Sequence, residues 1–297
     1  MSIPSNLVND LDSLIAFTKD AICNPFAKEE FAKAALMFDN LRMGGKHFGG
    51  KLDDARAWTN LLLPRFVQEF PTVVIEKQAT LNDPYGWTTR ENRQFERDPS
   101  KANLKREKIH LNGSIFKEMV AAAGSDTMKY FFNTFTMEIT MIHEVAHVFF
   151  SQLAEGSDTP LGMGPSSAGM GEGGAHLEIN LIGAILDRPP RQAGRPLSTG
   201  EVGLTDVNGN YWRIDDQLIK DFCQGKYNWK LIQKTVQSPP TYTPGAASSQ
   251  PATTGGKPKV KATNSNIERH TVRLTKYSGK NRFIYQAPLH LVFDRDQ

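Results

Sequence analysis

The segment from residue 143 to 147 carries side chains whose types and spacing suit a metal ion. It reads His143-Glu144-Val145-Ala146-His147, which is the pattern H-E-x-x-H. On an α-helix, residues four apart lie about 40° apart around the axis and roughly 6 Å apart along it. The two imidazoles therefore point the same way and can bind one ion through ring nitrogens. Glu144 then lies beside the open position of the ion, where its carboxylate can take a proton from water.

The sequence around this motif predicts the helix that it requires. Apolar residues recur in steps of three and four from Asp126 to Leu153, which is the helical period. They are Met128, Phe131, Phe132, Phe135, Ile139, Ile142, Ala146 and Phe149 or Phe150. Ser125 or Asp126 can cap its start. The alternative is an ordinary core helix that happens to carry two His and a Glu. Three ionisable groups in a buried segment are costly without a partner, which favours a metal site.

A third protein ligand is needed, and the next acidic cluster offers candidates. Glu172, His176 and Glu178 follow one another within eight residues. On one regular helix the two Glu side chains point about 120° apart, so they cannot both face one ion. His176 shares the face of Glu172 and is a weaker candidate. Either Glu178 or His176 is then available as the alternative third ligand, or to orient a ligand imidazole from behind.

Two families of metallopeptidases differ in where this third ligand lies. In metzincins the motif continues to H-E-x-x-H-x-x-G-x-x-H. Here Phe150 and Leu153 occupy the last Gly and His positions, so that pattern fails. The chain instead resembles gluzincin metallopeptidases, in which a ligand Glu follows some tens of residues later on a second helix. Glu172 lies 25 residues after His147.

The residues from Glu172 to Glu178 carry the rest of the resemblance. The run begins Glu-Gly-Gly-Ala, similar to the E-G-x-A-x-x-x-E of the aminopeptidase branch, but Glu178 comes one residue early. It is also similar to an E-x-G-x-x-x-E run in uncharacterised fungal proteins that look like metallopeptidases. The resemblance covers roughly residues 130–186.

The resemblance implies a zinc-dependent peptidase. Zn²⁺ would be held by His143, His147 and Glu172, with Glu144 as the general base. A second donor to the oxyanion is usual in such enzymes, and the sequence does not choose among its candidates. They are His176, Tyr211, Tyr277, Tyr285 and His270.

Two other functions remain open from the sequence. One is a metalloenzyme on the same scaffold that acts on a small molecule. The other is a non-catalytic binding module whose zinc joins two helices. Glu144 distinguishes them, because a purely structural site has four protein ligands and needs no base.

Composition narrows the class of protein further. The chain has 297 residues, 35 basic and 32 acidic, with a net charge of +3, which gives no basis for nucleic-acid binding by bulk electrostatics. Cys23 and Cys223 form no C-x-x-C pair and fit a reducing compartment, with a single bridge as the alternative. The first residues show no secretory signal, and no apolar run approaches a membrane span. We therefore expect a cytoplasmic protein with no membrane partner. The sequence does not indicate an oligomeric state.

Helices, strands and loops around the motif are expected as follows. Helical patterns cover 6–43 with a break at Pro25, then 53–69, 114–123, 177–186 and 215–224. Short strands are expected at 72–76, 108–112, 270–274 and 289–293, and a hairpin at 205–214 around Asn208-Gly209. The charged stretch 88–108 is expected to be a solvated loop. The Gly-rich stretch 156–174 is interpreted equally as a mobile lid or a tolerant surface loop.

One strand has a functional expectation attached. In zincins an edge strand before the metal helix binds extended substrate as an added strand. By analogy, the strand at 108–112 would take this position, and His110 or the backbone near Asn112 would line the cleft.

These patterns together predict an α+β fold. Residues 1–237 would form a mostly helical, zincin-like domain with a small β-sheet beside the metal-binding helix. Residues 238–266, rich in Pro, Ser, Thr, Gly and Lys, would be a disordered linker or loop. Residues 267–297 would be a β segment that packs back on the main domain, since about 30 residues are too few to fold alone.

Overall fold

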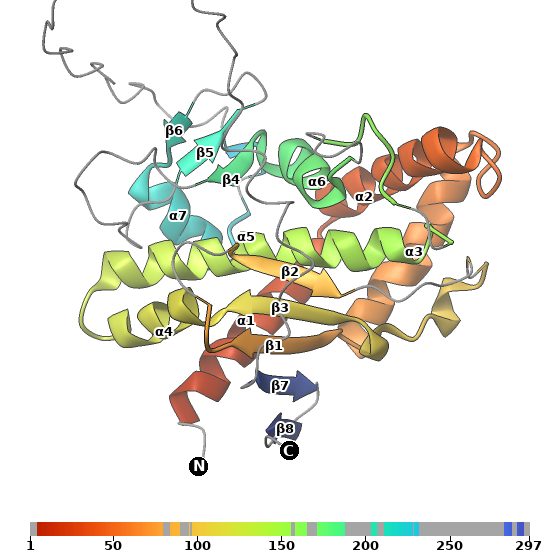
Figure 1. Cartoon of the computed structure of the whole chain (residues 1–297). Helices are drawn as coiled ribbons and strands as arrows, with labels where there is room; N and C mark the ends of the chain where they lie inside the picture. Colours follow the sequence, from red (N-terminus) through yellow and green to blue (C-terminus); the bar gives the residue numbers. More distant parts are fainter. Residues whose placement is uncertain are drawn as a thin grey trace, which may run out of the picture.

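The structure is a computed structural model and has a mixed α+β architecture (Figure 1). It describes residues 5–79, 84–89, 95, 97–155, 158–164, 171–187, 203–206, 211–227, 229–231, 282–286 and 290–293. Within these ranges the side chains of 5–8, 187, 211, 282–286 and 290–293 are outside the description.

The long helix α5 (Thr127–Ser151) lies at the centre of the fold. It begins at Asp126, whose side chain accepts a hydrogen bond from the Lys129 amide, 3.0 Å away. Most of its residues from Phe132 onward are buried, because the sheet covers one side of the helix and other helices cover the rest. In Figure 1, α5 crosses the molecule between the sheet on one side and α6 and α7 on the other. The helix expected at 126–153 is therefore present.

Three N-terminal helices pack beside α5. They are α1 (Ser5–Cys23), α2 (Pro25–Phe38) and α3 (Leu52–Gln68), with a π-helical turn over Asp39–Met43. Asn24 caps α2, and Pro25 is tolerated there because the first helical amide has no partner within the helix. Aromatic pairs join α2 to α5, with ring centroids 4.9 Å apart for Phe31 and Phe149.

A five-stranded sheet lies beside α5 and contacts it through the strands β2 and β3 (Figure 1). Its order is β2 (Gly86–Thr89), β3 (Lys108–Asn112), β1 (Thr72–Glu76), β7 (Arg282–Gln286) and β8 (His290–Phe293). β1 and β3 are parallel, and the other pairs are antiparallel. The helix α4 (Gly113–Ala122) follows β3 directly, capped by Asn112. Short 3-10 turns at Pro99–Lys101 and Leu104–Arg106 lead into β3.

A smaller unit follows the segment that carries Glu172. The helix α6 (Gly173–Ile182) leads into a three-stranded antiparallel sheet of β4 (Ile185–Asp187), β5 (Gly203–Thr205) and β6 (Tyr211–Arg213), and then α7 (Asp216–Cys223). β5 and β6 pair as the expected hairpin, whose Asn208-Gly209 turn lies outside the described residues. The expected linker at 238–266 and the strand at 270–274 also lie outside them.

Three sequence predictions near the site are wrong. The loop expected at 88–108 starts too early, because its first two residues belong to the strand β2. β3 is therefore not an edge strand, since β2 pairs with one side of it and β1 with the other. The helix expected to reach residue 186 ends at Ile182, because Gly183 adopts a left-handed conformation (φ 88°) that stops it.

The described residues contain no helix that is both long enough and apolar enough to cross a bilayer.

Candidate metal centre

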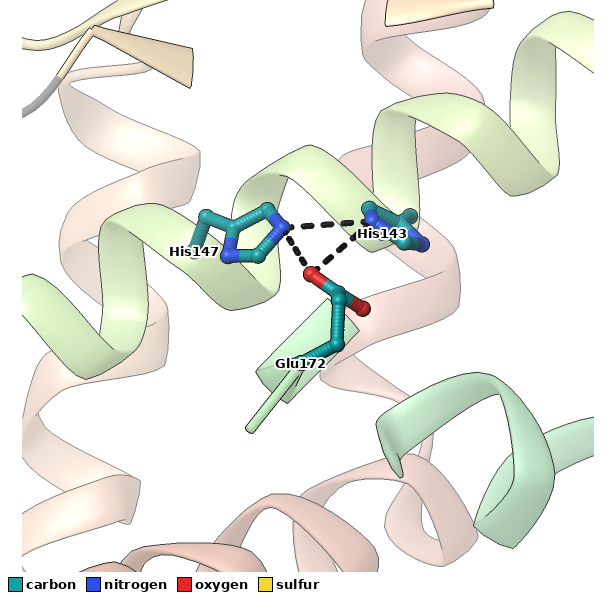
Figure 2. A group of neighbouring side chains, drawn as sticks. All are labelled: His143, His147 and Glu172. Atoms are coloured by element: carbon teal, nitrogen blue, oxygen red, sulfur yellow. Dashed lines mark hydrogen bonds and ion pairs between the residues drawn. The ribbon is translucent and has the colours of Figure 1, made fainter. Parts of the chain in front are cut away.

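His143, His147 and Glu172 converge on one point between α5 and α6 (Figure 2). The Nε2 atoms of the two imidazoles are 3.2 Å apart. Oε1 of Glu172 lies 2.6 Å from Nε2 of His147 and 3.5 Å from Nε2 of His143. The one-turn spacing on α5 aligns the two rings, and the start of α6 brings the carboxylate to them.

The separations between these three atoms fit a bound zinc ion. Two atoms that each bind a tetrahedral zinc ion at about 2.0–2.1 Å lie roughly 3.3 Å apart. The distances from His143 Nε2 to the other two atoms, 3.2 and 3.5 Å, match this value. Nε2 of His147 and Oε1 of Glu172 are 2.6 Å apart, as in a direct ion pair. To bind one zinc ion, these two atoms would have to separate by less than about 1 Å. Two nitrogens and one carboxylate oxygen are also a common donor set of catalytic zinc.

Glu172 has two roles, one for each carboxylate oxygen. Oε1 joins the cluster, while Oε2 accepts a hydrogen bond from the Ala175 amide and so caps α6. The partial positive charge at a helix N-terminus stabilises such a carboxylate. Glu172 therefore lies at the cap of the second helix, which fixes the side chain from both ends.

Two glycines allow α6 to approach α5 this closely. A methyl group on Gly174 would overlap the ring of His143 at Cδ2 and Nε2. A methyl group on Gly173 would lie 2.7 Å from Cδ2 of Phe150. The pair Gly173-Gly174 is thus required by the packing of the metal-site helix against the segment that supplies Glu172.

Glu178 contacts the cluster from behind. Its Oε1 is hydrogen-bonded to Nδ1 of His143, and its Oε2 accepts from the Leu186 amide at 2.6 Å. A carboxylate on Nδ1 keeps the proton there and leaves Nε2 as the metal-binding atom. The structure thus places Glu172 in the cluster and Glu178 behind His143.

His176 is turned away from the three converging atoms. Its Nε2 lies 3.1 Å from Nδ2 of Asn180, and it is not part of the group that could hold one ion. Burial lowers the pKa of His176, although the nearby carboxylates of Glu30 and Glu172 oppose this. It remains adjacent to Glu172 along the helix but does not act as a third ligand in this arrangement.

The charges of Glu172 and His143 depend on each other. Burial raises the pKa of Glu172, but His147 and His143 outweigh it and hold that pKa well below its ordinary value. Burial lowers the pKa of His143, but Glu172 and Glu178 outweigh it and hold that pKa well above its ordinary value, so a metal ion that binds Nε2 has to displace a proton from it. Glu172 is therefore ionised and offers a negative oxygen to the site.

Glu144, which follows His143 on α5, is buried and has a partner on the sheet. Its Oε2 accepts a hydrogen bond from the hydroxyl of Thr88 at 2.6 Å, and its backbone carbonyl lies 3.2 Å from the same hydroxyl. Thr88 is in β2, which packs against α5 so closely that a methyl group on Gly86 would lie 2.7 Å from Cγ2 of Thr140.

The expectation that His110 or the backbone near Asn112 lines the cleft is wrong, because β3 is paired on both sides and the Asn112 amide donates to the Tyr85 carbonyl at 2.8 Å. His110 is buried, with Nδ1 2.8 Å from Oε1 of Glu76 and Nε2 2.7 Å from Oγ1 of Thr89. The ring of Trp87 stacks on it with centroids 5.1 Å apart. Asn112 is buried and its side chain caps α4. Both residues therefore hold the sheet together, and β2 is the strand that contacts Glu144, through Thr88.

The Gly-rich stretch before Glu172 is partly packed. The Glu172 amide donates to the Met163 carbonyl at 2.7 Å, and the Gly171 amide donates to the Thr159 carbonyl at 3.1 Å. Met163 and Thr159 are buried. These bonds fix the approach of Glu172 to the cluster. Residues 156–157 and 165–170 of the stretch lie outside the described residues, and neither the lid nor the surface-loop interpretation is tested there.

The remaining oxyanion candidates are not placed by the structure. Tyr277 and His270 lie outside the described residues. Tyr211 and Tyr285 lie in β6 and β7, with their side chains outside the description.

Sequence reasoning missed Thr88 and the need for Gly174. The double glycine at 173–174 was a signal for close approach, but a threonine in a short polar strand carries no such signal.

Comparison with known proteins gives no further assignment: no protein-family model, no curated protein and no solved structure matches this chain. The function therefore has to be argued from the site.

Proposed function

We propose that this protein is a zinc-dependent hydrolase of the gluzincin type, most simply a peptidase, on a zincin-like fold. The observation that carries the proposal is the convergence of two Nε2 atoms and one carboxylate oxygen between α5 and α6, with Glu144 one residue from the first imidazole. A structural site would use four protein ligands, and the described residues bring only three to this point.

The chain's own residues divide the chemistry between them. His143, His147 and Glu172 would hold the ion, which when bound acts as a Lewis acid toward a carbonyl oxygen. Glu144 takes a proton from the attacking water and returns it to the leaving amine. Glu178 keeps the proton of His143 on Nδ1 throughout.

The first experiment measures metal by mass spectrometry on the purified full-length protein beside His147→Ala. We expect about one zinc per chain in the parent, because the three donor atoms match one tetrahedral ion, and loss of zinc in the variant. Absence of metal from both, even after zinc is supplied, would mean that the motif is a coincidence on a core helix.

The second experiment tests the role of Glu144. Glu144→Gln should retain zinc and lose cleavage of a mixed peptide library by roughly 10²–10⁴-fold, the usual contribution of a general base. Glu172→Ala should lose zinc instead. Equal cleavage by Glu144→Gln and the parent would show that the water-activation scheme is wrong. Zinc binding without peptide cleavage in either protein would favour the small-molecule enzyme or the non-catalytic module.

A further inference from the structure

A contact between the sheet and the metal-site helix suggests how Glu144 is aimed. The carboxylate of Glu144 is buried between α5 and β2, where it accepts a hydrogen bond from Thr88. This contact is separate from the three converging donor atoms and from Glu178. It involves a residue of a strand that the sequence did not predict.

We propose that Thr88 is a positioning residue that fixes the Glu144 carboxylate and directs its free oxygen to the reacting water. This inference rests on the proposed function. The Thr88 hydroxyl donates to Oε2 at 2.6 Å, and the described residues show no hydrogen bond to Oε1. A carboxylate held at one oxygen presents the other in a fixed direction, and proton uptake at Oε1 leaves Oε2 as a carbonyl acceptor for the same bond.

The strand β2 is built to hold Thr88 in this position. Gly86 and Thr88 lie on the face toward α5, where Gly86 has room for no side chain. Trp87 and Thr89 lie on the opposite face, against His110. Backbone pairing of Thr88 with Ile109 fixes the register. The hydroxyl of Thr88 therefore reaches Glu144 from a strand that is held on both faces.

The test compares full-length, zinc-loaded Thr88→Val, Thr88→Ala and Thr88→Ser with the parent. Val keeps the shape of Thr without its hydroxyl. Ala is the second variant, because the added methyl of Val would press against the carboxylate and could impair folding. Ser keeps the hydroxyl. Thr89→Val is the matched control, since it removes a hydroxyl from the next residue on the opposite face of β2.

All four variants should retain zinc, because Thr88 and Thr89 are not among the donors. In crystals of Thr88→Val or Thr88→Ala, the Glu144 carboxylate should leave its position in the parent, whereas Thr88→Ser and Thr89→Val should keep it. With fluorescein-labelled casein as the probe, kcat should fall by about 10-fold or more in Val and Ala with KM little changed, as expected for a misaimed base. Ser should restore it.

The Glu144 position decides the outcome even if casein is not cleaved. An unmoved carboxylate in both Thr88→Val and Thr88→Ala would overturn the inference, as would full activity of either variant. Failure of the proposed function looks different, because it appears as loss of zinc binding or as an active Glu144→Gln enzyme.

Discussion

The carboxylate of Glu178 joins three parts of the molecule at the scale of one residue. It lies on α6, contacts Nδ1 of His143 on α5, and accepts the amide of Leu186 on β4. A single side chain thereby connects the orientation of the His143 imidazole to the packing of the smaller sheet. Carboxylates behind ligand imidazoles fix both the tautomer and the ring orientation.

Glu178→Gln should weaken zinc affinity by about 10–100-fold, the usual effect of losing the partner of a ligand imidazole. The amide keeps the size of the side chain but removes the charge that holds the proton on Nδ1. Competition with a fluorescent chelator would measure the affinity. His176→Ala is the control and should keep the parent's affinity, because His176 is turned toward Asn180. Equal affinities in Glu178→Gln and the parent would contradict this account.

At the scale of elements, the site depends on how closely α6 can approach α5. The sequence predicted α5 because a helical period sustained over some 25 residues leaves little ambiguity. It could not predict β2, since the four residues Gly86–Thr89 have neither the length nor the apolar alternation of a strand. The contact between Thr88 and Glu144 joins positions 56 residues apart, which no local pattern encodes.

The same contrast holds for the candidate site residues. The relative positions of His143, Glu144 and His147 were predictable because one helix fixes them. Glu172 was chosen over Glu178 by resemblance, and what separates them in space is that Glu172 is a cap while Glu178 is inside the helix. The end of α6 was misplaced because the run Leu177–Leu186 is apolar on both sides of Gly183, and a short apolar run does not distinguish helix from strand.

Gly174→Ala should weaken zinc binding by at least about tenfold, because the added methyl overlaps the His143 ring and displaces either the imidazole or α6. Isothermal titration of the metal-free protein with zinc would measure it. Ala175→Gly is the control: it weakens the same helix by roughly 0.5–1 kcal/mol without adding an atom near the site. If both variants bound zinc equally, helix stability rather than steric overlap would be the cause.

At the scale of the whole molecule, one ionisable group on α5 lies in the core away from the site. Glu138 is 3% exposed, and its Oε2 has no hydrogen-bond partner in the described part of the chain. The groups around it are the thiol of Cys223 on α7, with which it shares a hydrogen bond, and the phenols of Tyr130 and Tyr227. Burial raises the pKa of Glu138 well above its ordinary value of 4.5.

This pKa shift predicts that Glu138→Gln is more stable than the parent at neutral pH. Below about pH 4.5 the carboxyl is protonated in folded and unfolded chains, so it costs nothing there. As the pH rises from there through the raised folded-state pKa, the unfolded chain loses this proton before the folded chain does. Unfolding then releases a proton, so the parent loses stability. Urea unfolding of the metal-free proteins from pH 4 to 9 should show that the free energies of unfolding of Glu138→Gln and the parent differ more as the pH rises.

Glu29→Gln provides a control of opposite sign. A hydrogen bond from Arg56 lowers the pKa of Glu29, so its contribution is present at neutral pH and fades as the pH falls through the lowered value. Parallel curves for Glu138→Gln and the parent would mean that Glu138 is not held neutral in the core.

The two oxygens of Glu172 have a consequence for motion in the chain. One oxygen faces the two imidazoles, and the other caps α6 through the Ala175 amide. A cation that holds the first oxygen also holds the second in place. Binding of the cation therefore opposes fraying of the first turn of α6, and fraying of that turn weakens binding of the cation. The backbone amide of Ala175 therefore becomes a reporter of the metal, with its hydrogen exchange slowing as zinc binds.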